Sequence, residues 1–196
     1  MKRICVYCGS NHGADPGFTR VTKELGTLLA DEGIGLVYGA GNVGLMGEVA
    51  DAVLAGGGEV IGAMPGVLKD KEVTHLGLTE VVYVDSMHER KQFMADRADG
   101  FIALPGGIGT LEELIEVFTW LQLGIHTKPI GVLNIAGYYD KLLKFLDHMV
   151  TEKLLRQEQR DMLLVDEAPA GLLQQMRAFK PTEVEKWFGR DGTKAT

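Results

Sequence analysis

The segment between Phe101 and Glu113 brings together residue types that could bind and act on a phosphorylated molecule. An apolar run ends at Pro105, passes through three glycines and continues as an acidic helical pattern. A buried strand that feeds a helix through such a turn leaves backbone N–H groups unpaired at the helix start, where the helix dipole also favours negative charge. We therefore expect an anion site, most often one for phosphate, with the Glu113 carboxylate beside it, at Gly106, Gly107, Gly109 and Thr110.

The same residues also fit a purely structural motif. Thr110-Leu111-Glu112-Glu113 matches the capping box, in which Thr110 would accept from the Glu113 backbone N–H and the Glu113 side chain would return to the cap. The local pattern favours this cap. The double glycine Gly106-Gly107 favours the anion site instead, because a cap does not need it. A Glu113 side chain bonded to its own cap is not free for a substrate, so both interpretations stay open.

A second glycine-rich loop, residues 39–47, contains the pattern G-x-G-x-x-G. A dinucleotide-binding fingerprint follows the first strand and has an acidic residue about 20 positions on that reaches the ribose. Here the pattern follows the second predicted strand, and Glu59 begins a strand. This disfavours a nicotinamide dinucleotide. We expect a phosphate or ribose cradle that includes Gly41 and Gly44, and a tight turn with no ligand role remains the alternative.

Basic residues stand at an unusual place in the segment 85–91. Arg90 and Lys91 fall near the start of a predicted helix, where the dipole favours acidic residues. An anion in front of them would make that placement easier, whereas the plain alternative is that both project into solvent. Asp85 or Ser86 is expected to cap the helix. His88 has no partner that can be identified from the sequence.

These segments must be positioned by alternating strands and helices. Strands are expected at residues 4–8, 36–38, 59–63, 80–84, 100–104, 129–133 and 163–165, and helices at 16–32, 44–55, 87–98, 110–123, 138–152 and 168–178. Such alternation predicts an α/β fold with a single Rossmann-like domain over residues 1–189, built on a doubly wound parallel sheet of about seven strands with helices on both faces. Residues 190–196 are expected to form a disordered tail.

Ligands of such sheets bind beyond the carboxyl ends of the strands, where the strand order reverses. The loops at that edge are residues 9–13, 39–47, 65–74, 85–90 and 105–110, which adds Gly9 and Ser10 to the candidate binding residues. The site is therefore expected where these loops meet.

The composition limits the kinds of partner that we expect for this protein. The net charge is −7, which argues against a broad nucleic-acid surface. No uncharged apolar stretch reaches the roughly 18–20 residues of a membrane span, and the apolar run after Met1-Lys2-Arg3 is too short for a signal peptide. We expect a cytoplasmic protein with neither nucleic acid nor membrane as partner. No His, Cys and acidic residues show metal-ligand spacing.

The two cysteines form a C-x-x-C pattern. Both Cys5 and Cys8 fall in the first predicted strand, where side chains alternate between faces. We expect them to point in opposite directions and to be unpaired in a reducing compartment, not to form a redox site.

Three strings together closely resemble the LOG ("Lonely guy") family of cytokinin riboside 5′-monophosphate phosphoribohydrolases, long mislabelled as lysine decarboxylases. They are V-Y-G-A-G with G-L-M-G in residues 37–47, M-H-E-R-K in 87–91 and P-G-G-I-G-T-L-E-E in 105–113. The resemblance runs from about residue 4 to residue 166. It implies a Rossmann-like homodimer that hydrolyses the N-glycosidic bond of a purine nucleoside 5′-monophosphate, giving the free base and ribose 5-phosphate.

Residue roles are implied by the same resemblance. Arg90 and Glu113 would be the catalytic pair, and the substrate contacts would be Glu72, Lys91, Gly107, Gly109, Thr110 and Thr119. Ala40 stands where the family often has a third glycine, so the loop is expected to follow a different path there. The charged residues 69–71 are expected near the base. An apolar face that includes Leu114, Phe118 and Leu121 is expected at the dimer contact.

The chemistry fits these residues. Glycosidic cleavage passes through an oxocarbenium-like state that a carboxylate can stabilise, and an arginine can hold phosphate or ribose oxygens. No cofactor is required. Two alternatives stay open: a carrier of an anionic cofactor with the same fold, and a pyridoxal-phosphate decarboxylase, which would need a Schiff-base lysine that the sequence does not single out. Whether the base is N6-modified or plain adenine also stays open.

Overall fold

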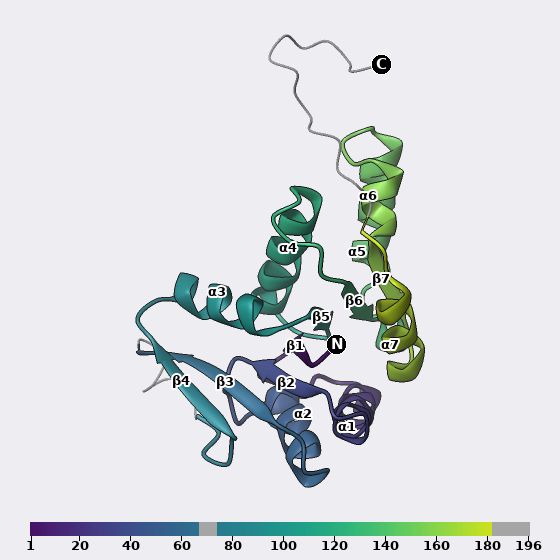
Figure 1. Cartoon of the computed structure of the whole chain (residues 1–196). Coiled ribbons are helices and arrows are strands. Elements are labelled where there is room, and N and C mark those ends of the chain that lie inside the picture. Colours follow the sequence, from purple (N-terminus) through teal and green to yellow (C-terminus); the bar gives the residue numbers. More distant parts are fainter. Residues whose placement is uncertain (67–73, 182–196) are drawn as a thin grey trace.

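The computed structural model describes residues 1–66 and 74–181 and shows one parallel sheet with helices on both faces (Figure 1). The strand order is β4-β3-β2-β1-β5-β6-β7, and every strand pair is parallel. The strands are β1 (Arg3–Tyr7), β2 (Gly35–Tyr38), β3 (Val60–Pro65), β4 (Glu80–Val84), β5 (Gly100–Ala103), β6 (Ile130–Leu133) and β7 (Leu163–Asp166). The predicted fold class is confirmed.

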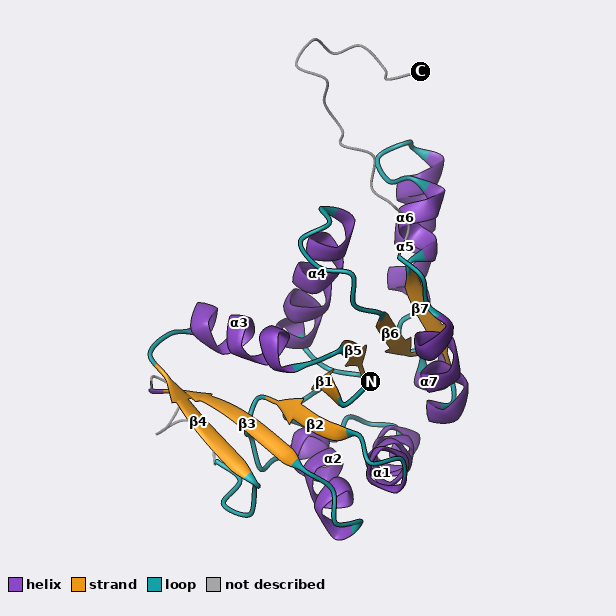
Figure 2. Ribbon diagram, viewed as in Figure 1, coloured by secondary structure: helices purple, strands orange, loops and turns teal. Residues whose placement is uncertain are grey.

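Helices cover both faces of the sheet (Figure 2). They are α1 (Pro16–Asp31), α2 (Gly44–Ala55), α3 (Met87–Arg97), α4 (Ile108–Gln122), η2 (Ile135–Gly137), α5 (Asp140–Thr151), α6 (Gln157–Asp161) and α7 (Pro169–Ala178). The apolar residues of α1, α2 and α7 pack in one core cluster, and those of α3, α4 and α5 pack in another. Because buried strands supply side chains to both clusters, the sheet is apolar on both faces.

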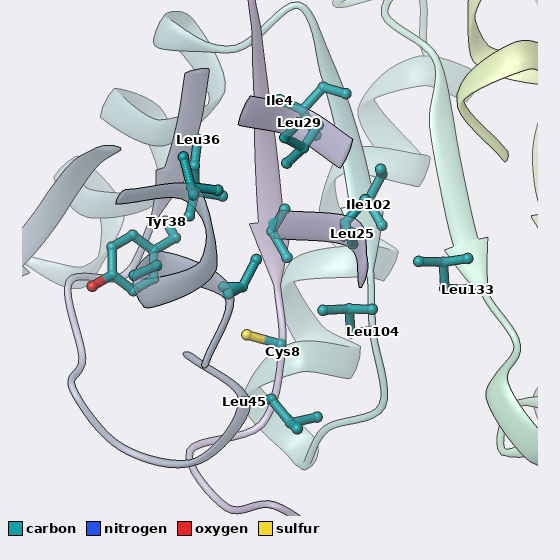
Figure 3. Packing of buried hydrophobic residues seen from close by; sticks show 14 of the residues in the cluster. Ile4, Cys8, Leu25, Leu29, Leu36, Tyr38, Leu45, Ile102, Leu104 and Leu133 are labelled. Carbon is teal, nitrogen blue, oxygen red and sulfur yellow. The ribbon is translucent and has the colours of Figure 1, made fainter. Parts of the chain in front are cut away.

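Figure 3 shows the first of these clusters, in which Ile4, Leu25, Leu36 and Leu104 meet from a helix and three neighbouring chain segments. Cys8 belongs to this cluster, whereas Cys5 belongs to the cluster on the opposite face. Both thiols are buried and free. The prediction that the two cysteine side chains point in opposite directions is confirmed.

Two local expectations were wrong. The first is the capping box at Thr110: α4 begins two residues earlier, Gly107 is its N-cap, and no side chain caps it. The second is the apolar face expected at a dimer contact, because Leu114, Phe118 and Leu121 are buried in the core of the chain itself. The helix therefore starts earlier than the sequence pattern indicated, and its apolar face packs inside the chain.

The short α6 and η2 were not expected, and α5 begins at Asp140, two residues later than expected. Glu72, the charged residues 69–71 and the tail 190–196 lie outside the described residues. In the described chain no helix is both long and apolar enough to cross a membrane.

Candidate active site

The strand order reverses beside β1. The chain moves outward from β1 through β2 and β3 to β4, then returns to place β5 on the other side of β1. The loops that follow β1, β2 and β5 therefore leave the same edge of the sheet and diverge there.

Backbone hydrogen bonds join these three loops. The Gly9 N–H donates to the Pro105 carbonyl at 3.0 Å, and the Met46 N–H donates to the Gly9 carbonyl at 3.3 Å. The loop after β1 thus bridges the two glycine-rich loops. Because each bond satisfies backbone groups beyond the strand ends, the loops keep a defined spacing.

A cavity of about 370 Å³ lies at this switch point. Of the residues predicted from the sequence, it collects Gly9, Ser10, Arg90, Gly107, Gly109, Thr110 and Glu113. Its other lining residues are Val6, Tyr7, Cys8, Gly39, Met46, Met87, Met94, Ile108 and Glu112. A cavity of this size, with a few polar groups placed among apolar ones, is typical of small-molecule sites.

The start of α4 forms one wall of the cavity and is open. A Cβ built on Gly107 or Gly109 meets no other atom within 4 Å, and neither glycine has a positive φ. The protein itself therefore does not require glycine at these two positions. Their missing side chains leave room at a helix N-terminus, where backbone N–H groups bind anions.

Packing and hydrogen bonds fix the glycine turn before α4. A Cβ on Gly106 would overlap the Thr110 hydroxyl, so this glycine is required by packing. The Tyr138 hydroxyl donates to the Gly106 carbonyl, and the Tyr139 hydroxyl donates to the Leu104 carbonyl at 2.7 Å. The segment that follows β6 thus fixes the path along which the chain enters the helix.

Arg90 reaches the cavity from α3. Only 6% of the residue is exposed, and its Nη2 donates to the Gly39 carbonyl at 2.7 Å. Any side chain on Gly39 would overlap this guanidinium. A buried arginine needs hydrogen-bond partners to offset desolvation, so Gly39 serves Arg90 in two ways, with its carbonyl and with the space that a side chain would fill.

Glu113 brings negative charge to the same cavity. Burial, followed by the nearby Glu113 carboxylate, raises the pKa of the Cys8 thiol above its ordinary range. The same carboxylate contributes, after burial and Cys5, to the raised pKa of Tyr7. Tyr7 and Cys8 lie at the end of β1 and line the cavity, so the charge of Glu113 acts on the cavity's own lining residues. Arg90 lines the same cavity.

The 39–47 loop has a different character. Gly41 and Gly44 do not line the cavity; Gly44 borders a neighbouring hollow together with Ser10 and Asp51. Gly44 has φ +56°, and a Cβ there would overlap the Asn11 backbone. Ala40 has φ 63°, the left-handed conformation that alanine rarely adopts, so the loop keeps a path suited to glycine.

Two predicted substrate contacts do not line the cavity. The Lys91 ammonium bonds to Glu112 at 2.6 Å and to Glu116 at 2.9 Å. The Thr119 hydroxyl donates to the Ile115 carbonyl at 2.7 Å, on an exposed part of α4. Neither residue is among those that line the cavity.

The sequence did not single out the three methionines of the cavity, Met46, Met87 and Met94. Met87 and Met94 stand three residues before and four after Arg90, which places all three on one face of α3. That spacing could have identified them. Methionine is flexible and polarizable and makes favourable contacts with aromatic rings. These three methionines, which we call the methionine wall, therefore suit a flat heteroaromatic group.

Fold and site together define the class: a Rossmann-like α/β protein with a nucleotide-sized cavity at its topological switch point, an open helix N-terminus and an arginine–glutamate set. Among the described residues, no three His, Cys, Asp or Glu side chains are grouped as a metal site would need. The family model described as "Possible lysine decarboxylase" matches residues 46–176.

Curated relatives specify the family. The chain is 48% identical over 181 residues to the cytokinin riboside 5′-monophosphate phosphoribohydrolase LOG of Oryza sativa subsp. japonica, covering 92% of this chain and 75% of the relative. It is also 48% identical to the cytokinin riboside 5′-monophosphate phosphoribohydrolase LOG7 of Arabidopsis thaliana, covering 92% of this chain and 83% of that relative. The chain belongs to the LOG family.

Solved structures with the same fold are more distant. The molybdenum cofactor carrier protein of Chlamydomonas reinhardtii superposes with a TM-score of 0.68 at 20% identity, covering 90% of this chain and 98% of that one. The molybdenum cofactor binding protein of Rippkaea orientalis gives 0.66 at 20%, covering 91% and 97%. At this identity the likeness concerns the fold alone.

Proposed function

We propose that this protein hydrolyses the N-glycosidic bond of a purine nucleoside 5′-monophosphate, releasing the base and ribose 5-phosphate. One observation supports it most: the open start of α4, with Gly107 and Gly109 leaving room for an anion, borders the same cavity as Arg90 and Glu113. The family relatives named as phosphoribohydrolases support the same reaction.

In this proposal the phosphate binds at the N-terminus of α4, to backbone N–H groups of the first turn, where Gly107, Gly109 and Thr110 line the cavity. The base lies against the methionine wall. The ribose then lies between Arg90 and Glu113. Binding energy from the phosphate holds the sugar in register with these two side chains, as remote groups do in many enzymes.

Cleavage of the bond between C1′ and the base nitrogen places positive charge on the sugar ring. The Glu113 carboxylate stabilises that charge and orients the water that adds to C1′. The water gives up one proton, and the departing base takes one, so the reaction balances without any redox step. Arg90, held by the Gly39 carbonyl, binds ribose or phosphate oxygens with its planar guanidinium.

A carrier of an anionic cofactor is the second candidate, because solved structures with that role share the fold. A carrier needs the anion-binding glycines but no carboxylate beside the sugar. A decarboxylase with pyridoxal phosphate has less support: among the described residues that line the cavity there is no lysine to form a Schiff base.

The first prediction is that hydrolysis depends on the 5′-phosphate. We expect AMP to be cleaved with a kcat/KM at least about 10²-fold above that of adenosine, because a nucleoside cannot use the interactions at the helix start. Matched assays of base release measure this ratio, and an N6-isopentenyl AMP in parallel decides the base preference. Comparable values for AMP and adenosine would contradict the phosphate site. If no nucleotide released its base, the carrier of an anionic cofactor would be the remaining candidate.

A homodimer in the cytoplasm is part of the proposal. Leu123 and Ile125, beyond the end of α4, and Phe145 on α5 are large apolar side chains more than half exposed, as expected for a surface that another subunit covers. The two free buried thiols fit a reducing compartment. Sedimentation at micromolar concentration tests the assembly, and a stable, active monomer would contradict it.

A further inference from the structure

We propose that Tyr138 is a positioning residue for the anion site. Its hydroxyl orients the peptide bond between Gly106 and Gly107 so that the Gly107 N–H points toward bound phosphate. The inference rests on the proposed function of the cavity and deepens it. Tyr138 belongs to the segment after β6 and does not line the cavity. It therefore acts through the glycine turn before α4, without contact with the substrate.

Three successive carbonyl groups of this turn accept hydrogen bonds from other segments of the chain. The bonds run from the Tyr139 hydroxyl to Leu104 at 2.7 Å, from the Gly9 N–H to Pro105 at 3.0 Å and from the Tyr138 hydroxyl to Gly106 at 2.5 Å. Because a trans peptide is planar, a bond that fixes its carbonyl also fixes the direction of the peptide nitrogen on the other side. The turn is therefore fixed peptide by peptide.

The two peptides that the tyrosines hold differ in one respect. The Leu104 carbonyl shares its peptide with the nitrogen of Pro105, which carries no hydrogen. The Gly106 carbonyl shares its peptide with the Gly107 N–H, which points to the side opposite the carbonyl. The hydroxyl on Gly106 therefore orients a hydrogen-bond donor, whereas the hydroxyl on Leu104 fixes only the path of the chain.

The oriented donor lies at the open wall of the cavity. Gly107 is the N-cap of α4 and lines the cavity, and a Cβ built on it meets no atom within 4 Å. Because Tyr138 holds the Gly106 carbonyl from outside the cavity, the N–H on the other side of the peptide is turned toward this open space. Backbone N–H groups at a helix start bind an anion when they point at it.

The Tyr138 ring is itself held in place. It packs edge-to-face against Phe18 of α1, with ring centroids 5.5 Å apart, and against Tyr139, with centroids 4.9 Å apart. The Asn134 side chain fixes the neighbouring backbone, because its Oδ1 accepts from the Tyr139 N–H at 2.7 Å and its Nδ2 donates to Asp140 at 2.8 Å. A hydroxyl on a fixed ring holds its acceptor in one direction, which a water molecule at the same carbonyl would not.

The test compares Tyr138→Phe with Tyr139→Phe, since each change removes one hydroxyl and keeps the ring. A hydrogen bond to a charged group contributes about tenfold or more to binding, and a misdirected N–H loses part of this. We expect Tyr138→Phe to raise both the KM for AMP and the inhibition constant of ribose 5-phosphate about fivefold. The inhibition constant of adenosine, which has no phosphate, should stay within about twofold of wild type.

Tyr139→Phe, the matched control, should show the reverse. Tyr139 and Leu104 are 5% and 0% exposed, so loss of the hydroxyl leaves a buried carbonyl without this donor and should lower Tm by about 5 °C. Both inhibition constants should stay within about twofold of wild type. Tyr138 is 45% exposed, so water can replace its hydroxyl, and Tm of Tyr138→Phe should change by less than about 2 °C.

A merely structural role would give a different pattern. The proposal is overturned if Tyr138→Phe leaves the inhibition constant of ribose 5-phosphate within about twofold of wild type, or weakens adenosine equally. It is also overturned if Tyr139→Phe weakens ribose 5-phosphate as much, because the path of the chain would then matter and not the direction of one N–H.

Wild-type protein that releases no base from any nucleotide would refute the proposed function separately. The same comparison is then made with dissociation constants of ribose 5-phosphate and adenosine, measured by calorimetric titration of the wild type and both variants. A fivefold loss confined to ribose 5-phosphate and Tyr138→Phe would support the positioning role without the hydrolase. Wild-type protein that binds no ribose 5-phosphate would overturn the positioning role as well.

Discussion

Two glycine-rich loops follow parallel strands at the same edge of the sheet, yet they differ in whether the packing of the protein requires their glycines. In the 39–47 loop, Gly39 makes room for Arg90 and Gly44 makes room for the Asn11 backbone. In the 105–109 loop, Gly106 makes room for Thr110, but Gly107 and Gly109 make room for nothing in the described chain. Packing of the protein itself requires these glycines of the first loop, whereas Gly107 and Gly109 of the second leave open space at the cavity.

The helices that follow the two loops repeat the contrast. Each has a glutamate in its second turn. Glu48 on α2 forms ion pairs with Lys23 and His12, whereas Glu113 on α4 lines the cavity. A glycine loop and a following glutamate are thus not enough to define a catalytic site. The surroundings of the carboxylate decide whether it stabilises the fold or faces a substrate.

The largest effect is expected at Glu113. Glu113→Gln removes the charge that would stabilise an oxocarbenium-like state while preserving shape, so kcat for AMP should fall by about 10²-fold or more with little change in stability. Base release and thermal unfolding measure the two quantities. Glu48→Gln, the matched change on the other helix, should leave kcat within about twofold and lower stability slightly. Near-normal turnover by Glu113→Gln would make the catalytic assignment wrong.

The next test replaces one glycine from each loop, Gly109 and then Gly44, with alanine. Gly109→Ala should keep or slightly raise the free energy of unfolding, because alanine favours a helix by about 1 kcal/mol over glycine. It should raise KM for AMP about tenfold, since the new methyl group intrudes on bound phosphate. Inhibition by ribose 5-phosphate should weaken in parallel.

Gly44→Ala should show the opposite behaviour. Its positive φ costs an alanine about 1–2 kcal/mol, and overlap with Asn11 adds to this, so we expect at least about 2 kcal/mol lower unfolding free energy. Urea denaturation measures it. If Gly109→Ala destabilised the fold as much as Gly44→Ala, the division of the glycines into two classes would fail.

The smallest effect is expected at Ala40. Ala40→Gly relieves the left-handed conformation, by about 1 kcal/mol, but it also removes a buried methyl group that is worth a similar amount. We expect the unfolding free energy to change by less than about 1 kcal/mol, again by urea denaturation. A loss above about 2 kcal/mol would mean that the methyl group, which lies against Gly62, contributes far more than transfer from water.

Local patterns determined much of this protein. Apolar runs bounded by glycine identified the strands, their alternation with helices predicted the parallel sheet, and the edge where ligands bind followed from the topology. This reasoning was sufficient to place Arg90, Glu113 and the glycines of α4 at one site, because short motifs at strand ends must meet there. Family resemblance added the roles, which stay predictions.

Only the tertiary structure decided how individual side chains are used. Glu113 and Thr110 match a capping box in sequence, but α4 begins at Ile108 with Gly107 as its N-cap, so neither takes part in one. Lys91 and Arg90 are neighbours in the chain, yet a rotation of about 100° per residue turns one toward α4 and the other into the cavity. The methionine wall assembles from two helices, and the bonds from Tyr138 and Tyr139 connect segments more than thirty residues apart. Contacts between distant segments depend on packing, which no local pattern encodes.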